Sequence, residues 1–456
     1  MNSAMLVLII VVIYMAINIG IGIYGRKYAS NTDDYLRAEK TSDGWTICSS
    51  AIGSAIGSAV IIGTAGNAIA MGYSAVWYPV GCALAAAVFA VFLTRYVYRN
   101  RLLTFSDLFK QRYGGKFMTV YYSAIGPLAN IGMIGSQILA GKAIFEAFGL
   151  DGDIGIVVMA LVAFGYTLIS GLWGSMATAK FQVITVFVGL ALAFVYMVSQ
   201  GGLAEIHNGY YPDEFFSFTS LPSEIWVMFV VPVVLGAFCN SGTVQTTAAA
   251  KTEKGAYWGR LLSAIPIAVC GMIIVWLGMW SGMMFPDASA SSAFVLMMTN
   301  KLPPIVGALF VAAILAAIMS TASGAFVITD AMIVHDLYIP FVNPKATEKD
   351  QKRLIWIINI VLVVVSILTA LAFNNIISLL SATYSLTFSG CLIPIAGAIL
   401  WKGATRQGAI AAVLCGLAGF ALIQFGILSV PYGTLFPLIP SLIGFVVVSL
   451  FTKQGE

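Results

Sequence analysis

The stretch of sequence that decides the fold is Ser49-Ser50-Ala51-Ile52-Gly53-Ser54-Ala55-Ile56-Gly57-Ser58. A second stretch of the same character, Leu235-Gly236-Ala237-Phe238-Cys239-Asn240-Ser241-Gly242, follows five expected membrane spans later. Each glycine costs a helix about 1 kcal/mol relative to alanine, and hydroxyl side chains compete for the backbone, so both stretches can unwind. Unwound backbone is tolerated at membrane depth only where it is buried or lines a cavity. A matched pair of interrupted helices therefore indicates the binding site of a secondary transporter.

The composition is that of an all-α polytopic membrane protein. Hydrophobic residues make up 60% of the 456 residues, charged residues 9%, and the mean hydropathy is +0.94, whereas soluble domains carry about 25% charged residues. A helix needs about 20 apolar residues to cross the hydrocarbon core. We predict one transmembrane domain over residues 1–456 with about thirteen spans, near residues 4–24, 46–72, 74–94, 116–146, 153–172, 177–199, 224–248, 258–284, 304–334, 354–373, 376–400, 408–427 and 434–452.

The order of these spans suggests an internal repeat. Residues 46–199 and 224–400 form two groups of five spans, and each group opens with one of the interrupted helices. Because five is odd, the second group enters the membrane from the opposite side, which predicts an inverted 5+5 repeat. The remaining spans, one at residues 4–24 and two within residues 408–452, are expected at the periphery.

The basic residues predict the orientation. All but two of the 23 Lys and Arg residues fall on one set of loops, and the two exceptions are Lys142 and Lys301. The basic set includes Arg26, Lys27, Arg37, Lys40, Lys251, Lys254, Arg260 and Lys453. Basic loops stay in the cytoplasm. We therefore expect a multi-pass plasma-membrane protein with its N-terminus outside and its C-terminus in the cytoplasm.

Hydroxyl residues in the ninth span are candidates for binding an ion. Ser320 and Thr321, together with main-chain carbonyls near Ala317 and in the turn from Gly53 to Ile56, provide the hard oxygen atoms that a sodium ion prefers. The alternative is that these hydroxyls only bond to their own helix or join two helices, as small polar residues often do in membranes. The pattern alone leaves both interpretations open.

Several short motifs resemble those of the sodium:solute symporter family, in the same order along nearly the whole chain. They are Gly63-Thr64-Ala65-Gly66, Thr104-Phe105-Ser106-Asp107-Leu108, Ser170-Gly171-Leu172-Trp173, Val244-Gln245-Thr246 and Ala317-Ile318-Met319-Ser320-Thr321, with Thr178 and Gln182 entering span six. The resemblance implies a LeuT-like fold, alternating access, and a sodium site between the second and ninth spans. Carried over residue by residue, that site comprises Gly53, Ile56, Ala317, Ser320 and Thr321.

One motif departs from the family pattern. Members commonly show Thr-Asp at the start of span six, where this chain has Thr178-Ala179-Lys180. The missing acid, together with Gly324, argues against a second sodium site. Lys180 has two interpretations: a charge at the cytoplasmic edge, or an ammonium that takes the place of sodium and makes the carrier proton-coupled or sodium-independent.

The solute is expected between the two unwound turns. The predicted contact residues are small or apolar side chains on the second span and polar side chains on the fourth, seventh and eleventh spans: Ala55, Gly57, Val60, Asn130, Gln137, Asn240, Ser241 and Tyr384. Any of the polar ones could instead join two helices. With few charges available, the solute should be small, such as an amino acid, a carboxylate or a vitamin-like molecule.

These patterns predict a transporter and not an enzyme, because no catalytic motif is visible. The expected partners are a small organic solute, sodium as the coupling ion and the lipid bilayer. No cofactor, metal other than sodium, nucleic acid or obligate protein partner is indicated. A membrane sensor or channel on the same helices is the alternative from another class, although a channel would require a selectivity ring that the sequence does not show.

Overall fold

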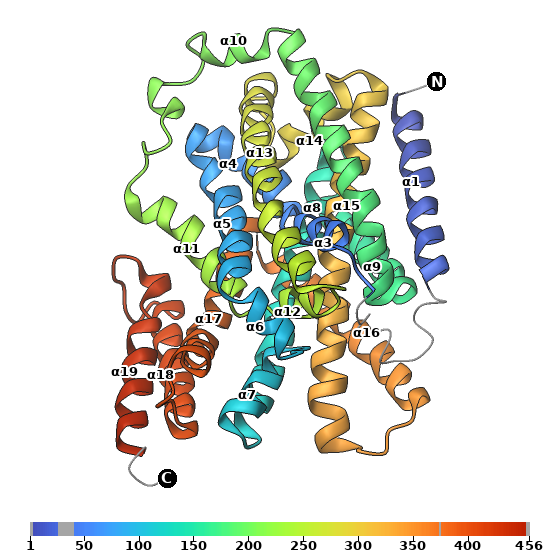
Figure 1. The fold of residues 1–456 in the computed structure, drawn as a ribbon. Coiled ribbons are helices and arrows are strands. Elements are labelled where there is room, and N and C mark those ends of the chain that lie inside the picture. Colours follow the sequence, from blue (N-terminus) through green and yellow to red (C-terminus); the bar gives the residue numbers. More distant parts are fainter. Residues whose placement is uncertain (1–2, 26–40, 374, 453–456) are drawn as a thin grey trace.

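A computed structural model describes residues 3–25, 41–373 and 375–452 of the chain. Arg26, Lys27, Arg37, Lys40 and Lys453 lie outside these ranges. The described part is a helical assembly whose elements follow in this order (Figure 1): α1 (Ser3–Gly25), α3 (Gly44–Ala55), η2 (Ala59–Gly63), α4 (Thr64–Met71), η3 (Gly72–Val76), α5 (Trp77–Phe92), α6 (Thr94–Arg99), α7 (Phe105–Tyr113), α8 (Phe117–Ala147), α9 (Gly152–Ser199), α10 (Gly202–His207), η4 (Asp213–Phe216), α11 (Ser223–Ala237), α12 (Ser241–Ala248), α13 (Glu253–Met284), α14 (Ala290–Asn300), α15 (Pro304–Ala331), η5 (Met332–Val342), α16 (Glu348–Ala372), α17 (Ile376–Leu400), α18 (Arg406–Gln424), η6 (Gly433–Leu435) and α19 (Leu438–Thr452).

The helices include enough long apolar segments for a polytopic membrane protein. Among the described residues, nine helices are long and apolar enough to cross a membrane. The bent pair α11 and α12 gives a tenth span if the two helices are counted together. Two shorter apolar helices, Val12–Tyr24 and Gly152–Leu168, cover two more of the predicted spans. Length and composition therefore support fewer spans than the thirteen predicted. Part of the difference arises because Ala59–Phe92 counts as one apolar segment by length and composition. Within it, α4 nevertheless ends at Met71 and Gly72 has a φ of 58°, at the boundary that we predicted.

Both predicted interruptions are confirmed. Helix α3 ends at Ala55, and the backbone leaves the helical conformation at Ile56, with φ −84° and ψ 73°, before η2 begins. Helices α11 and α12 are separated by residues 238–240 and bend by 49°. The Asn240 side chain caps α12 by accepting hydrogen bonds from the backbone N–H groups of Gly242 and Thr243 at 2.7 and 3.3 Å. Such a cap replaces the partners that the first turn of a helix lacks.

Helix α9 changes direction within its length. Its 48 residues are helical throughout, although a straight helix of that length would measure about 70 Å. The hydroxyls of Tyr166 and Thr178 are nevertheless hydrogen-bonded to each other. Residues twelve apart on a straight helix are separated by about 18 Å along its axis, so the chain must bend between these two. The two segments that we predicted, residues 153–172 and 177–199, therefore differ in direction but are not separated by a loop.

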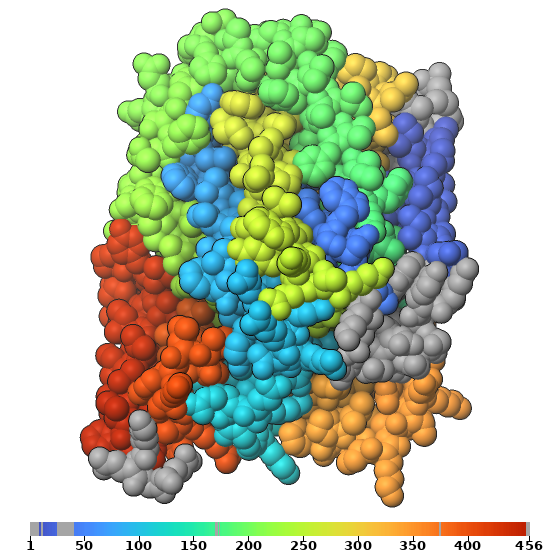
Figure 2. Space-filling view, in the orientation of Figure 1, coloured from blue at the N-terminus to red at the C-terminus, as the bar shows by residue number. Residues whose placement is uncertain are grey.

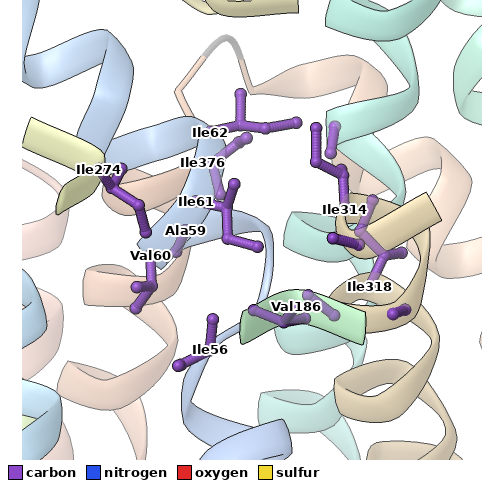
Figure 3. Close-up of a cluster of buried hydrophobic side chains, with 14 of the residues drawn as sticks. Ile56, Ala59, Val60, Ile61, Ile62, Val186, Ile274, Ile314, Ile318 and Ile376 are labelled. Atoms are coloured by element: carbon purple, nitrogen blue, oxygen red, sulfur yellow. The ribbon is translucent and has the colours of Figure 1, made fainter. Parts of the chain in front are cut away.

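Helix α15 is the central element of the assembly. It packs against α1, α3, α8 and α9, and nearly all of its residues from Gly307 to Ala331 are buried. Figure 3 shows Ile314 and Ile318 of α15 facing the residues on either side of the α3 break, Ile56 below it and Ala59 to Ile62 above it. The first interrupted helix is thus held against α15 by apolar packing.

The first and the last two helices lie at opposite edges of the assembly (Figure 1). Helix α1 packs on α9 and α15, and α18 and α19 pack on each other and on α17. In the space-filling view, α13 lies in front between α3 and the segment α4–α5 (Figure 2). The interior therefore consists of the two interrupted helices together with α8, α9, α13, α15 and α17.

Helices α8 and α9 come into backbone contact at Gly141 and Gly155. A Cβ atom added at either glycine would overlap the carbonyl oxygen of the other. Small residues allow membrane helices to approach this closely. We expect Gly155→Ala to lower the melting temperature of the purified protein, because overpacking costs about 1–3 kcal/mol. Gly165→Ala on the same helix is the control, since nothing lies within 4 Å of its added Cβ, and it should leave the melting temperature unchanged or raise it. Equal effects of the two substitutions would contradict this contact.

Candidate functional site

A central cavity of about 130 Å³ lies between the two interrupted helices. The α3 break contributes Ala55 and Gly57 to its lining, and the α11–α12 break contributes Asn240 and Gly242. Further lining residues come from α5, α8, α9, α13, α15 and α17. The interruption of both helices thus produces one shared cavity, as the paired unwound stretches predicted.

A second, much smaller cavity of about 10 Å³ lies behind the first break. It is lined by Gly53 and Ile56 at the end of α3 and by Ala317 and Ser320 of α15, together with apolar residues and Gln182 of α9. Four of the five predicted sodium residues therefore line one cavity. The fifth, Thr321, is adjacent to it, because its hydroxyl lies 3.1 Å from both the Gly53 carbonyl and the Ala317 carbonyl.

The oxygen atoms at this small cavity have the chemistry of a sodium site. A hydroxyl carries one hydrogen, so Thr321 cannot fully satisfy both carbonyls at the same time. The Ser320 hydroxyl is close as well, because a Cβ at Gly53 would lie 2.5 Å from its oxygen. Carbonyl and hydroxyl oxygens are the ligands that hard cations bind in proteins. Gly53 permits this arrangement because any larger residue would occupy the space of the Ser320 oxygen.

Gly57, at the break itself, likewise leaves room for neighbouring polar side chains. A Cβ at Gly57 would lie 2.7 Å from Oε1 of Gln137 and 2.8 Å from the Thr321 hydroxyl. Gln137 holds the break in place, since its Oε1 accepts a hydrogen bond from the Ser58 N–H at 2.8 Å. Gln137 therefore satisfies a backbone group that the interrupted helix exposes, besides lining the central cavity.

Six of the eight predicted solute contacts line the central cavity: Ala55, Gly57, Asn130, Gln137, Asn240 and Tyr384. The other two do not. Val60 is fully buried in the apolar cluster around α15 (Figure 3), because η2 turns its side chain toward neighbouring helices. Ser241 is hydrogen-bonded to the Tyr122 hydroxyl at 2.7 Å and accepts from the Phe105 N–H at 3.2 Å, so it joins α12 to α8 and α7.

Gln182 is a candidate that residue patterns did not place at the ion site. It is 1% exposed, and its Nε2 donates to Oδ1 of Asn18 on α1 at 3.2 Å. Its Oε1 forms no hydrogen bond of ordinary geometry, and the Tyr14 hydroxyl of α1, which also forms none, lies close to the Gln182 side chain. A buried carbonyl oxygen without a partner is costly, and this one belongs to a residue that lines the small cavity. The signal in the sequence was only its place in a family motif.

Lys180 is paired with an acidic residue and lines neither cavity. Its Nζ lies 3.6 Å from Oδ1 of Asp43, and the Asp43 side chain is 59% exposed. Hydrogen bonds from Thr46 hold the pKa of the Asp43 carboxyl below its ordinary value, which keeps its charge available to the lysine. This pairing favours the interpretation of Lys180 as a charge at the edge of the membrane.

Outside these cavities, Asp107, His335 and Asp336 form a group whose potential ligand atoms lie within 4.8 Å of one another. The Lys110 ammonium lies 3.5 Å from Asp336 and 3.7 Å from Asp107. Thr104 also donates to Asp336 at 2.7 Å. These contacts tie α7 to η5 and supply positive charge from the protein itself.

Comparisons with known proteins identify the family. The model of the sodium:solute symporter family matches residues 35–416. The chain belongs to that family. It is similar to the sodium/proline symporter of Staphylococcus aureus, with 27% identity over 435 residues, covering 90% of this chain and 84% of the relative.

Solved structures share the fold of this family member. A substrate-bound, outward-open sialic acid symporter coupled to sodium aligns with a TM-score of 0.81 at 17% identity, over 98% of both chains. A transporter of the nucleobase-cation-symport-1 family aligns with a TM-score of 0.64 at 14% identity, over 92% of this chain and 95% of that one. MhsT in complex with L-phenylalanine aligns with a TM-score of 0.57 at 16% identity, over 90% of this chain and 99% of that one. The expected LeuT-like fold is therefore confirmed.

Family membership also decides the functional class. The chain is a sodium-coupled symporter in a membrane, and its relatives are transporters and not enzymes. The sensor and channel alternatives consequently lose their support.

The buried side chain of Gln182 yields a prediction about ion binding. We expect Gln182→Leu to weaken the stabilisation of the purified protein by sodium, because it removes a buried amide from the lining of the small cavity. The half-effective sodium concentration in a melting experiment should rise about 10-fold, the equivalent of one lost polar contact. Gln424→Leu, at the last residue of α18 and outside the lining of both cavities, is the control. A sodium response of Gln182→Leu equal to that of the unmodified protein would exclude this role.

The Lys180–Asp43 pair yields a second prediction. We expect Lys180→Ala to retain sodium-driven uptake at every pH from 6 to 8, because an exposed ion pair contributes little and lies outside both cavities. Uptake into proteoliposomes, measured with and without a sodium gradient across that pH range, checks this. A different result would show that the ammonium replaces the ion: uptake by the unmodified protein that does not depend on sodium and that is lost in Lys180→Ala.

Proposed function

We propose that this chain imports a small organic solute on the sodium gradient by alternating access, with sodium bound in the small cavity at the α3 break. The observation that carries the proposal is the convergence of the Gly53 and Ala317 carbonyls with the Thr321 hydroxyl. The nearby Ser320 side chain completes the set. The names of the relatives, a sodium/proline symporter and a sodium-coupled sialic acid symporter, support a small organic solute.

The solute is assigned to the central cavity. Asn130 donates its Nδ2 to the Thr329 hydroxyl at 2.8 Å, which leaves its carbonyl oxygen as an acceptor. Asn240 uses its oxygen to cap α12, which leaves its Nδ2 as a donor. Tyr384 closes the cavity against the second break, since a Cβ at Gly236 would lie 2.5 Å from its ring. These groups provide a few directed polar contacts in a mostly apolar pocket, as is usual for small-molecule sites.

The topology completes this proposal. Thirteen spans arranged as two inverted groups of five, at residues 46–199 and 224–400, place the two interrupted helices at corresponding positions. The bias of Lys and Arg puts the N-terminus outside and the C-terminus in the cytoplasm. The likeness to LeuT-fold structures supports this layout.

The ion site can be tested with single substitutions. We expect Ser320→Ala and Thr321→Ala each to raise the half-effective sodium concentration, since a lost ligand oxygen costs about 1–3 kcal/mol, or roughly 5- to 150-fold. Sodium-dependent melting of the purified protein measures this without knowledge of the solute. Ser366→Ala is the matched control, because Ser366 is also a buried hydroxyl and bonds to the Ile131 carbonyl on another helix at 3.2 Å. An equal sodium response in all four proteins would overturn the assignment.

A further inference from the structure

Arg260 is a buried cation that lines the central cavity. It lies on the first turns of α13, and the residue as a whole is 4% exposed. It borders the same cavity as Gly57 and Asn240 at the two breaks. We had placed Arg260 among the basic loop residues, and the structure corrects this, since helix α13 begins at Glu253 and turns the arginine inward.

The surroundings of Arg260 do not neutralise its charge. No acidic side chain lines the cavity among the residues that the structure describes, and Arg260 forms no ion pair with them. One terminal nitrogen, Nη2, donates to the Thr246 hydroxyl at 2.9 Å and to the Thr243 carbonyl at 3.4 Å. The guanidinium also lies 5.2 Å from the centre of the Phe89 ring. Its Nε is buried and has no hydrogen-bond partner.

Nearby arginines show what a purely structural role looks like in this region. Arg99 forms two hydrogen bonds of 2.9 Å with the carboxylate of Glu253, and Arg95 lies 3.9 Å from the same carboxylate. Both arginines are largely exposed. Glu253, at the start of α13, thus pairs with two surface arginines, whereas the buried Arg260 on the same helix has no acidic partner among the described residues. A buried charge without an ionic partner is costly, and a buried cation that lines a cavity is therefore a candidate for binding an anion.

We propose that Arg260 binds an anionic group, most simply a carboxylate, of the transported solute. The inference rests on the proposed function and narrows it to organic acids and amino acids. The planar guanidinium is suited to a carboxylate, and its other terminal nitrogen, Nη1, forms no hydrogen bond with the described residues and can donate to one. A bound anion would supply the missing negative charge in a cavity that no acidic side chain lines among the described residues.

The experiment uses proteoliposomes with an inward sodium gradient and a defined mixture of carboxylates, their neutral amides and neutral sugars. Mass spectrometry identifies the solutes that accumulate. We expect every accumulated solute to carry an anionic group and its amide counterpart to be left outside. Accumulation of a solute without an anionic group would overturn the inference while leaving sodium-coupled transport intact.

Substitutions then test Arg260 itself. We expect Arg260→Gln to raise the half-saturating concentration of the accumulated acid about 10- to 100-fold, as for a lost hydrogen bond to a charged group. Arg260→Lys should retain part of the affinity, since it keeps the charge but loses the planar pair of donors. Arg99→Gln is the control on the protein surface and should behave like the unmodified protein. An unchanged preference of Arg260→Gln for the acid over its amide would exclude the role.

The two levels of the proposal fail in different ways. Sodium-dependent melting without any solute should be the same in Arg260→Gln and the unmodified protein, which also shows that the variant is folded. If the unmodified protein neither responds to sodium nor accumulates any member of the mixture, sodium-coupled transport is itself wrong, and the role of Arg260 falls with it. If sodium stabilises both proteins and Arg260→Gln still prefers the acid over its amide as strongly as the unmodified protein does, only the role of Arg260 is wrong.

Discussion

The need to satisfy every backbone polar group inside the membrane governs this structure. A continuous helix meets that need by itself, whereas an interrupted one leaves N–H and C=O groups that other residues must bond. At the first break, Gln137 of α8 accepts from the Ser58 N–H, and Thr321 of α15 donates toward the Gly53 carbonyl. At the second, Asn240 caps α12 from within its own chain segment. The first break therefore depends on α8 and α15. The second depends on its own Asn240 and on α8, whose Tyr122 hydroxyl donates to the Cys239 carbonyl at 2.5 Å.

This difference gives the two breaks different physical characters. The first is surrounded by glycines at which an added Cβ would lie within 2.8 Å of side-chain oxygens of Ser320, Gln137 and Thr321. Close approach is what brings carbonyl and hydroxyl oxygens together at the small cavity. The second break instead faces the ring of Tyr384 and the wider central cavity. On the proposed function, the compact ion binds at the first break and the larger solute binds in the space between both breaks.

Sequence patterns predicted those features that depend on local chemistry. The two interruptions and the apolar spans follow from glycines, hydroxyls and hydropathy within short windows, whereas the proposed ion residues came from the family resemblance. Contacts between distant helices were not predictable in this way, since the partner of Gln182 is Asn18 on α1 and that of Ser241 is Tyr122 on α8. Counting charges also misplaced Arg260, because a positive charge near the end of a helix has the same pattern whether it points to solvent or inward. We predicted two separate segments where α9 is one bent helix, because Gly and Ser residues near the bend are typical of a loop.

The two cavities share part of their walls, and this bears on coupling. Ser320 lines both of them, and the α3 break contributes Gly53 and Ile56 to one and Ala55 and Gly57 to the other. On the proposed function, sodium would fix the conformation of this break through the Gly53 carbonyl and the Ser320 and Thr321 hydroxyls. A solute that then enters the central cavity would meet a wall already ordered and would bear less of the entropy cost of ordering it. Coupling free energies are reciprocal, so the solute would increase the affinity for sodium by the same factor. The same interruption that exposes the backbone in α3 would in this way make the binding of ion and solute interdependent.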